Sequence, residues 1–200
     1  MTRLPLKNLQ VTLDQAAERW PESDTLSDFR ADADLLKDEA AALAEADHWI
    51  TPHSGVAELA DERAIKLNWQ IPSGAKLEAG GTRILFPAST LGRKGAWELR
   101  ETGLPVTISG SVLEATGFWD GVDVEQRDFS LEGVAVVVQP AWVENQPRRL
   151  LRAVAAGVPV IASEACGLGG VDGVTVIRAG DTVGLKVVLE NFQASKDRRD

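Results

Sequence analysis

Residues 134–163 read VAVVVQPAWVENQPRRLLRAVAAGVPVIAS, and this stretch decides the fold. Residues 134–138 are an unbroken apolar run of strand length, which is typical of a parallel strand buried on both faces. A helix follows, which begins near Pro147 and ends at Gly157, where a left-handed cap is expected. A second apolar strand is expected at 158–162. The stretch therefore predicts a strand, a crevice loop, a helix and a second parallel strand, with a ligand site in the loop at the carboxyl end of the first strand.

The alternation of strands and helices continues on both sides of this stretch. Further strands are expected at 84–86, 106–109 and 174–177, and further helices at 95–101 and 181–192. The side chains of the last helix that are expected to face the sheet are Val183, Val187, Val188 and Phe192. Such alternation indicates parallel strands joined by right-handed crossovers. The predicted fold class is α/β, a Rossmann-like three-layer domain with a mainly parallel sheet.

The N-terminal part of the chain follows another pattern. Residues 24–46 predict a long helix with a capping box at Thr25 and Asp28. Its apolar stripe consists of Phe29, Ala33, Leu36, Ala40 and Leu43. A strand at 48–51, a short helix at 55–60 and a strand at 65–69 come next. Residues 72–81 are rich in Gly, Ala and Pro and mark a boundary. We therefore divide the chain into 1–75 and 76–200.

Three segments together resemble the retaining glycosyltransferases of the GT-B fold, of the group 1 type. The residues of the quoted stretch that carry the match are Pro140, Glu144, Pro147, Leu150, Leu151, Ala153, Ala156, Gly157, Pro159, Val160 and Ile161. Residues 84–95 look like the first strand of the family's donor domain followed by its Lys-Gly loop. Residues 46–52, more weakly, look like the last strand of its acceptor-side domain.

The resemblance implies the C-terminal, donor-binding half of such an enzyme. Two domains of ordinary size need about 300 to 400 residues, and this chain has 200. Residues 1–75 would then be a remnant of the acceptor-side domain with its long helix and linker, and residues 76–200 the domain that binds a nucleotide sugar.

Composition limits the classes of partner. The chain is 44% hydrophobic and 26% charged, contains one cysteine and carries a formal charge of −9. An acidic protein has little general attraction for nucleic acid, so no nucleic-acid partner is expected. The first twelve residues lack the apolar region of a secretory signal, and no apolar run has the length of a membrane span. We expect a soluble, cytoplasmic protein, and peripheral contact with the inner membrane stays open.

The resemblance implies the roles of three residues. Lys94, with Arg93, would neutralise the nucleotide diphosphate that leaves as the glycosidic bond breaks. Glu144 would be the first acid of the family's E-x7-E motif and would face the donor sugar. Read without the resemblance, Arg-Lys-Gly is an ordinary exposed turn, and Glu144 is a carboxylate that stabilises a helix N-terminus.

Cations at the start of the predicted helix point to an anion. Arg148 and Arg149 oppose the helix dipole, and Arg152 shares a helical face with Arg148. An anionic ligand above the helix start, near Gln146, would gain from the backbone N–H groups and the arginines together. A solvated polar face is the alternative.

Two positions depart from the family pattern. Arg152 stands where the motif has its second acid, and an arginine cannot accept the ribose hydrogen bonds that a carboxylate accepts. Ser89 stands where the family commonly has an arginine, which Arg93 would replace. These departures leave three readings open: an altered donor site, a donor with a different ribose contact, or a degenerate domain.

The other polar and aromatic residues give weaker signals. The glycines that begin at Gly167 fail the dinucleotide fingerprint. The resemblance to the glycosyltransferases nevertheless implies that the loop 164–170 approaches the nucleotide. His48, His53 and Cys166 are too poorly partnered to predict a metal site. Trp142 is expected to contact the base or sugar, and the other five tryptophans to pack or to lie at a domain interface.

The resulting hypothesis is a donor-domain portion of a retaining glycosyltransferase. It would take a nucleotide-diphosphate sugar as substrate, use no further cofactor and no metal, and transfer the sugar on its front face with the departing phosphate as base. The partners would be a sugar or lipid-linked acceptor and an acceptor-side domain from missing sequence or another chain. A non-catalytic interaction module that kept the fold is the alternative. A dehydrogenase is disfavoured, because no strand precedes a proper fingerprint.

Overall fold

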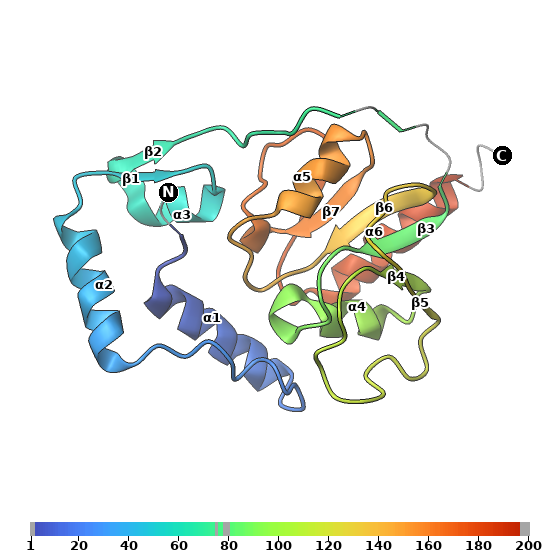
Figure 1. Ribbon diagram of the computed structural model, residues 1–200, viewed down its shortest axis with the longest axis horizontal. Helices are drawn as coiled ribbons and strands as arrows, with labels where there is room; N and C mark the ends of the chain where they lie inside the picture. The colour runs from blue at the N-terminus through green and yellow to red at the C-terminus, as the bar shows by residue number, and fades with distance from the viewer. Residues whose placement is uncertain (1–2, 75, 78–80, 197–200) are drawn as a thin grey trace.

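The computed structural model describes residues 3–74, 76–77 and 81–196, and its centre is a six-stranded parallel sheet (Figure 1). The strands, in chain order, are β3 (Arg83–Phe86), β4 (Val106–Ile108), β5 (Val124–Gln126), β6 (Val134–Gln139), β7 (Val160–Ser163) and β8 (Val174–Ile177). Their spatial order is β5, β4, β3, β6, β7, β8, and every neighbouring pair is parallel. The predicted α/β class with a Rossmann-like, mainly parallel sheet is confirmed.

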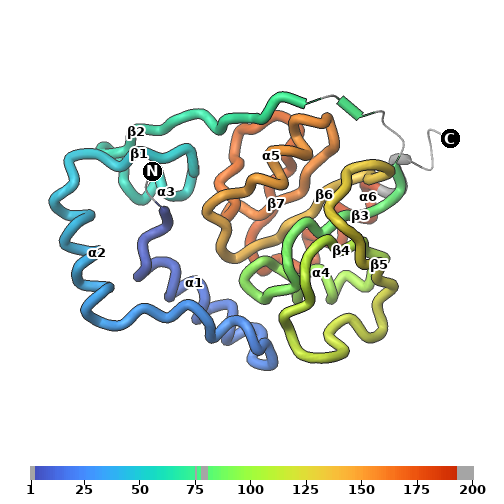
Figure 2. Tube along the Cα trace, in the orientation of Figure 1, coloured from blue at the N-terminus to red at the C-terminus, as the bar shows by residue number. Residues whose placement is uncertain are grey.

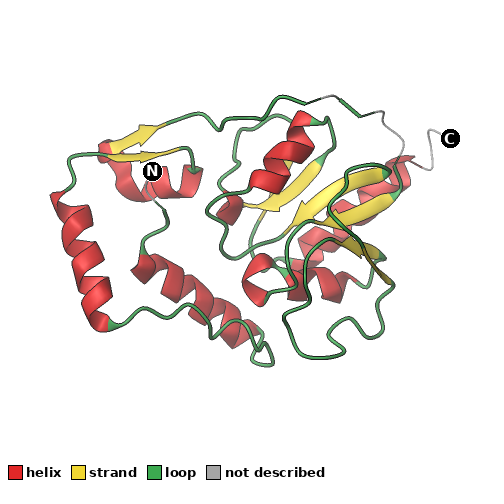
Figure 3. Cartoon of the chain, in the orientation of Figure 1, coloured by secondary structure: helices red, strands yellow, loops and turns green. Residues whose placement is uncertain are grey.

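Two hydrophobic cores lie on the two faces of this sheet. Side chains alternate along each strand, so Ile84 and Phe86 of β3 enter one core and Leu85 enters the other. The first core also receives α4 (Ala96–Thr102) and α6 (Thr182–Lys196), and the second receives α5 (Arg148–Ala155). Figure 3 shows the resulting helix, sheet and helix layers.

An N-terminal helix that the sequence reading missed belongs to the first core. α1 (Leu6–Arg19) buries Leu13 and Ala16, and Trp20 and Leu26, which follow it, are buried in the same cluster. The ring of Trp20 stacks on Trp97 of α4 with 5.3 Å between ring centroids. Residues from the first 26 positions therefore fill part of the core of the sheet domain. The division of the chain near residue 76 stays a prediction.

This packing predicts that α1 contributes to global stability. Leu13→Ala removes a side chain that is 1% exposed, and the free energy of unfolding is expected to fall by about 2 to 5 kcal/mol. Val11→Ala, on the same helix but 49% exposed, is the matched control and is expected to change it by less than about 0.5 kcal/mol. Urea denaturation of both variants measures the difference. Equal small effects would mean that α1 is not part of the cooperative core.

The remaining N-terminal elements form a small unit beside the sheet domain (Figure 2). They are α2 (Ala33–Glu45), β1 (Trp49–Thr51), α3 (Ser54–Ala60) and β2 (Ala64–Lys66). β1 and β2 pair in parallel as a two-stranded sheet of their own. Trp49, Val56 and Ala60 make its core. The predicted strands at 48–51 and 65–69 both exist, although the second already ends at Lys66.

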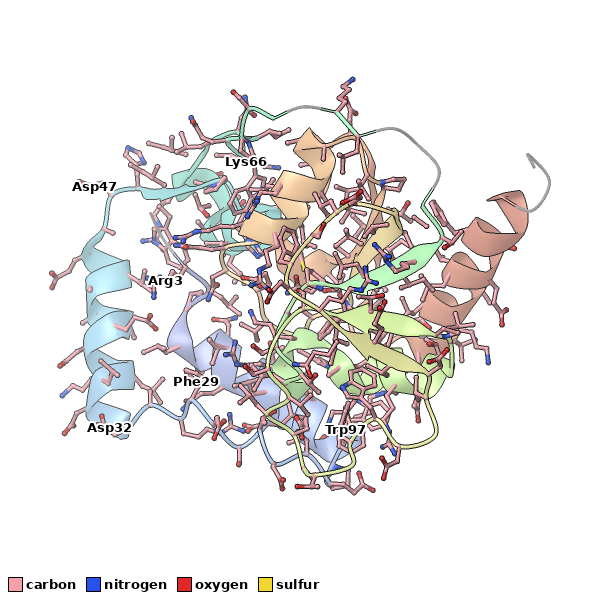
Figure 4. The ribbon with its side chains drawn as sticks, turned by 45° about the vertical axis from the view of Figure 1, so that its right-hand side comes forward. Arg3, Phe29, Asp32, Asp47, Lys66 and Trp97 are labelled. Carbon is pink, nitrogen blue, oxygen red and sulfur yellow. The ribbon has the colours of Figure 1, made fainter. Side chains whose placement is uncertain are left out.

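The long predicted helix is shorter than expected. α2 begins at Ala33, where Asp32 accepts a hydrogen bond from the backbone N–H of Leu35 as N-cap, so the capping box at Thr25 is wrong. Phe29 adopts a φ of 60°, a left-handed conformation that breaks a helix, and its ring is exposed. The predicted stripe is also not a core face, because α2 buries none of its residues. Asp32 and Asp47, labelled in Figure 4, lie near the two ends of this peripheral helix.

Two further expectations need correction. In α6, Val183 and Val187 are exposed, and the core is filled by Leu185 and Leu189, with Val188 and Phe192 packed against it. The strand β5, at the edge of the sheet, is not among the strands expected from the sequence. Of the predicted boundary segment, residues 75 and 78–80 lie outside the described residues. No helix among the described residues is both long and apolar enough to cross a membrane.

Candidate functional site

The loops that follow β3, β6 and β7 meet at one edge of the sheet. These strands are neighbours and parallel, so their carboxyl ends open on the same side, where ligands bind in open α/β sheets. The loop after β3 carries Lys94, and the loop after β6 carries Glu144. The loop after β7 begins with a short 3-10 helix, Glu164–Cys166.

The first two of these loops are held together by their backbones. The carbonyl of Arg93 accepts the N–H groups of Trp142 and Val143 at 3.0 and 3.1 Å. Gly95 has a φ of 86°, and a Cβ at this position would lie 2.2 Å from the carbonyl oxygen of Pro140. Only glycine allows this approach. The Arg-Lys-Gly sequence thus fixes the place of the Lys94 side chain relative to the second loop.

Lys94 and Glu144 form an ion pair between the first two loops. The Nζ of Lys94 donates to Glu144 Oε2 at 2.8 Å and to the carbonyl of Val143 at 3.2 Å. Gln139, the last residue of β6, donates to the same carboxylate oxygen at 2.9 Å, and the backbone N–H of Gln146 donates to Oε1 at 2.8 Å. The two side chains of the pair are only 16% and 13% exposed.

These contacts control the charge of Glu144. Burial by itself would raise the pKa of its carboxyl, but Lys94 and the donors from Gln146 and Gln139 outweigh it, and the pKa is lowered. The carboxylate is therefore ionised at neutral pH. The stability that this network adds is present above the ordinary pKa of a glutamate and is lost as the pH falls through the lowered value.

Arg93 is a second cation at this site with unused bonding capacity. Its guanidinium lies 4.5 Å from the ring centre of Phe29, and its Nε is buried without a hydrogen-bond partner. Burial lowers the pKa of Arg93, although Glu144 and Asp28 act in the opposite direction. The Nε of Arg93 is thus desolvated and unpaired inside the protein, while the side chain brings a positive charge to the wall of the cavity around Lys94.

Six of the eight predicted site residues line one cavity of about 330 Å³. They are Ser89, Arg93, Lys94, Glu144, Gln146 and Arg148. Arg149 also lines this cavity and is fixed there by hydrogen bonds to the carbonyl of Pro87 and to Ser109. The wall therefore has four cationic side chains and one carboxylate, in a protein whose formal charge is −9.

The other two predicted residues lie elsewhere. Arg152 lines a separate cavity and lies over Phe129 at 5.1 Å from the ring centre. Gly167 has a φ of 65° and lies against His53, whose Cγ would be 2.4 Å from a Cβ at this position. Neither residue lines the cavity around Lys94. One helical turn separates Arg148 from Arg152, and it is enough to place them at different cavities.

His53 connects the N-terminal part of the chain to two site loops. Its Nδ1 accepts the backbone N–H of Val56, so the ring hydrogen lies on Nε2. This atom lies 3.2 Å from the carbonyl oxygen of Glu144 and 3.0 Å from that of Ala165, and donates to both. His53 thus acts as the N-cap of α3 and lies beside Glu144. Nothing in the local sequence signals it.

Glu98 of α4 is a buried carboxylate that the sequence reading missed. Its Oε1 accepts the indole N–H of Trp20 at 2.8 Å and that of Trp142 at 2.7 Å, while Oε2 is buried without a partner. Burial raises the pKa of Glu98, against the effects of these two indoles. The indole N–H of Trp142, predicted to contact base or sugar, is thus bonded inside the protein.

Replacement of Glu98 tests this raised pKa. A glutamate whose folded-state pKa exceeds 4.5, its ordinary value, destabilises the folded state increasingly as the pH rises above that value. Glu98→Gln keeps an oxygen for both indoles and loses the titration. As the pH is raised from 5 to 8, the unfolding free energy of the variant, measured by urea denaturation, is expected to increase relative to that of the wild type. A difference that does not change with pH would contradict the assignment.

A larger cavity, of about 770 Å³, adjoins the first one at Glu144. α1 contributes Thr12, Gln15 and Arg19, and the loop after β8 contributes Arg178. Its volume is within the range of small-molecule sites. Among the described residues, no group of three or more His, Cys, Asp and Glu side chains could hold a metal ion.

Comparison with known proteins gives a result only at the level of structure. No protein-family model matches the chain, and no curated protein is a significant match. The lipopolysaccharide outer core galactosyltransferase WaaB, in its apo form, superposes with a TM-score of 0.59 at 16% identity, over 79% of this chain and 56% of that one. TarM superposes with a TM-score of 0.59 at 14% identity, over 79% of this chain and 39% of its own.

A third structure, a variant of Staphylococcus aureus TarM in complex with fondaparinux, alpha-GlcNAc-glycerol and UDP, gives a TM-score of 0.58 at 10% identity. The match covers 86% of this chain and 41% of that structure's chain. The chain thus spans about two fifths to just over half of these structures. At such low identity the likeness establishes the fold, which the chain shares with glycosyltransferases of the GT-B type. Its correspondence to their donor-binding half stays a prediction.

Proposed function

We propose that this chain is the donor-binding portion of a retaining glycosyltransferase, which takes a sugar from a nucleotide diphosphate. The observation that carries the proposal is the cavity where Lys94 and Glu144 lie 2.8 Å apart, with three arginines in the same wall. A diphosphate brings negative charge to these cations. A sugar brings hydroxyl groups to the carboxylate beside them.

Each group of the cavity has a role in this reaction. Lys94 and Arg93 hold the diphosphate and stabilise the charge that grows on it as the anomeric C–O bond breaks. Glu144 accepts hydrogen bonds from the sugar and stabilises positive charge at the anomeric carbon. Residues 146–149, which lead into α5, and Ser89 complete the binding site. The acceptor oxygen bonds the same face of the anomeric carbon, and its proton passes to an oxygen of the departing phosphate.

The acceptor-side half would come from further sequence or from a partner chain. The β1 and β2 pair is a two-stranded sheet, which is marginal by itself. Apolar side chains around it are 41–46% exposed: Ile50, Leu59, Ile65 and Leu67. This surface fits an incomplete acceptor-side sheet. The acceptor would be a sugar or a lipid-linked molecule, and the reaction would take place in the cytoplasm.

The test is thermal stabilisation of the whole chain by UDP, GDP, ADP, TDP and CMP, each with its sugar conjugates. A ligand at about one hundred times its Kd adds roughly 2.7 kcal/mol to the unfolding free energy. A selective shift would name the nucleotide. A well-folded sample that responds to none of them would overturn the proposal for this chain by itself.

A non-catalytic interaction module is the second candidate function. It is favoured by Arg152, which replaces the motif's second acid and lies over Phe129 in a cavity of its own. The exposed apolar residues around β1 and β2 would then be the binding surface. This candidate predicts a stable complex with another protein and no turnover of any nucleotide sugar, with or without that partner.

A further inference from the structure

The position of Phe29 is not explained by packing. Its side chain is 63% exposed and belongs to none of the hydrophobic clusters among the described residues. Its backbone has a φ of 60°, and this left-handed conformation costs free energy for a bulky side chain. Such strain persists only where the surrounding structure fixes it, and it concentrates at functional sites. The conformation of Phe29 therefore points to a role other than burial.

The ring of Phe29 contacts a cation of the candidate site. The guanidinium of Arg93 lies over the ring at 4.5 Å from its centre, within the range of an attractive cation–π contact. Among the described residues, this guanidinium has no hydrogen-bond or ion-pair partner. The ring is thus what restrains it. An aromatic face holds a cation without using its N–H groups, so the terminal N–H groups of Arg93 keep their capacity to bind an anion.

The segment that precedes this ring is anchored to the loop after β3. The carboxylate of Glu114, which is 6% exposed, accepts the hydroxyl of Thr25 and, at 2.7 Å, the backbone N–H of Gly92. The side chain of Leu26 packs on the same glycine, where a Cβ would be 2.6 Å from the leucine Cγ. The ring and the guanidinium follow closely on these anchored residues. The anchors therefore keep the two groups beside each other.

We propose that Phe29 is a positioning residue for a diphosphate, because its ring holds the guanidinium of Arg93 at the wall of the cavity around Lys94. This inference rests on the proposed function, which assigns the diphosphate of the donor to this cavity. A free arginine side chain has rotamer freedom that binding must remove, so a guanidinium that is already ordered binds an anion at a lower cost in entropy. The strained backbone of Phe29 then serves affinity and not stability.

The binding test titrates pyrophosphate calorimetrically into the full chain, since this probe requires no knowledge of the base or the sugar. Phe29→Ala is expected to weaken its binding by about threefold to tenfold, the effect of leaving one flexible side chain unordered. Phe29→Trp keeps an aromatic face and should bind like the wild type, whereas Phe29→Leu keeps only apolar bulk and should bind like Phe29→Ala. Leu35→Ala, which removes another exposed apolar side chain, is the matched control and should leave the affinity unchanged.

Two further variants separate this role from a structural one. Phe29→Gly removes the ring and also relieves the positive φ, so its midpoint of urea denaturation should equal or exceed that of the wild type while its affinity for pyrophosphate falls. In an Arg93→Ala background, Phe29→Ala should have no further effect on this affinity, because the ring acts only through the guanidinium.

The outcomes distinguish this inference from the proposed function. Equal binding of pyrophosphate by the wild type and Phe29→Ala, or an effect of Phe29→Ala that persists without Arg93, would overturn the role of Phe29 and leave the proposed function intact. Pyrophosphate binding that depends on Phe29, with no response to any nucleotide or nucleotide sugar, would support the positioning role and overturn the proposed function. A wild-type chain that binds neither pyrophosphate nor a nucleotide would overturn both.

Discussion

Lys94→Ala is expected to weaken the binding of a nucleotide diphosphate by about 100-fold. The reason is twofold. The variant loses the cation that would face the diphosphate. It also removes the ion-pair partner of Glu144, whose side chain is only 13% exposed. That carboxylate would then repel the phosphates that enter the cavity. Calorimetric titration of wild type and variant with the stabilising nucleotide measures the loss.

The exposed pair of Arg127 and Glu125 provides a control. Its N···O distance is 2.6 Å, but both side chains are 47% exposed, so Arg127→Ala should change neither nucleotide binding nor stability appreciably. Circular dichroism and urea denaturation establish that the Lys94 variant is folded. A folded Lys94→Ala protein that binds the nucleotide as tightly as the wild type would refute the role of this lysine.

Glu144→Gln is expected to separate binding from transfer. Transfer should fall by about 10² to 10³, because the charge that stabilises the anomeric carbon is gone. The affinity for pyrophosphate should stay the same or increase. In the wild type Lys94 forms an ion pair with Glu144 at 2.8 Å, and in the variant it no longer has to give up this charged partner to bind the phosphates. Coupled measurements of product formation and of pyrophosphate affinity test both halves, with Glu125→Gln as control. A parallel loss of binding and transfer would instead mean that Glu144 supports the fold of the cavity.

The sheet domain was predictable because, along most of it, the local sequence pattern favours the same structure that the packing of distant segments requires. The apolar run of β6 has apolar side chains on both faces of the strand, and all of them are buried. Such a strand is stable only where both faces of the sheet are covered. The Arg-Lys-Gly loop is a similar case, since Gly95 is needed both for its positive φ and for the approach to Pro140. Where one residue satisfies two constraints, the sequence carries a strong signal.

The N-terminal part was less predictable because its patterns are satisfied by distant residues. The apolar residues of 24–46 suggested a helix with a core face, yet Leu26 is buried beside α1 and Phe29 is exposed in a left-handed turn. The hydroxyl of Thr25 does not cap a helix. It donates to Glu114, 89 positions away, which also accepts from Ser23 and from the backbone N–H of Gly92.

The sequence predicted the ionic residues that line the candidate site. It did not predict the residues that hold the site loops in place. Lys94 and Glu144 occupy loops after neighbouring strands, so topology alone brings them close. Gln139 had a readable signal, as a polar residue at the end of an apolar strand. His53 and Glu98 had none, because their partners are backbone carbonyls and indoles from remote segments.

The carboxylate of Glu98 also changes what counts as one folding unit. It receives one indole from the residue after α1 and another from the crevice loop, so its burial depends on both parts of the chain at once. Together with Leu13 and Leu26 in the same core, this makes α1 and the residues up to Leu26 comparable to a subunit bound to the sheet domain, although both belong to one polypeptide. A chain cut between β2 and β3 would yield two fragments that need each other, in the manner of a split protein whose halves reassemble.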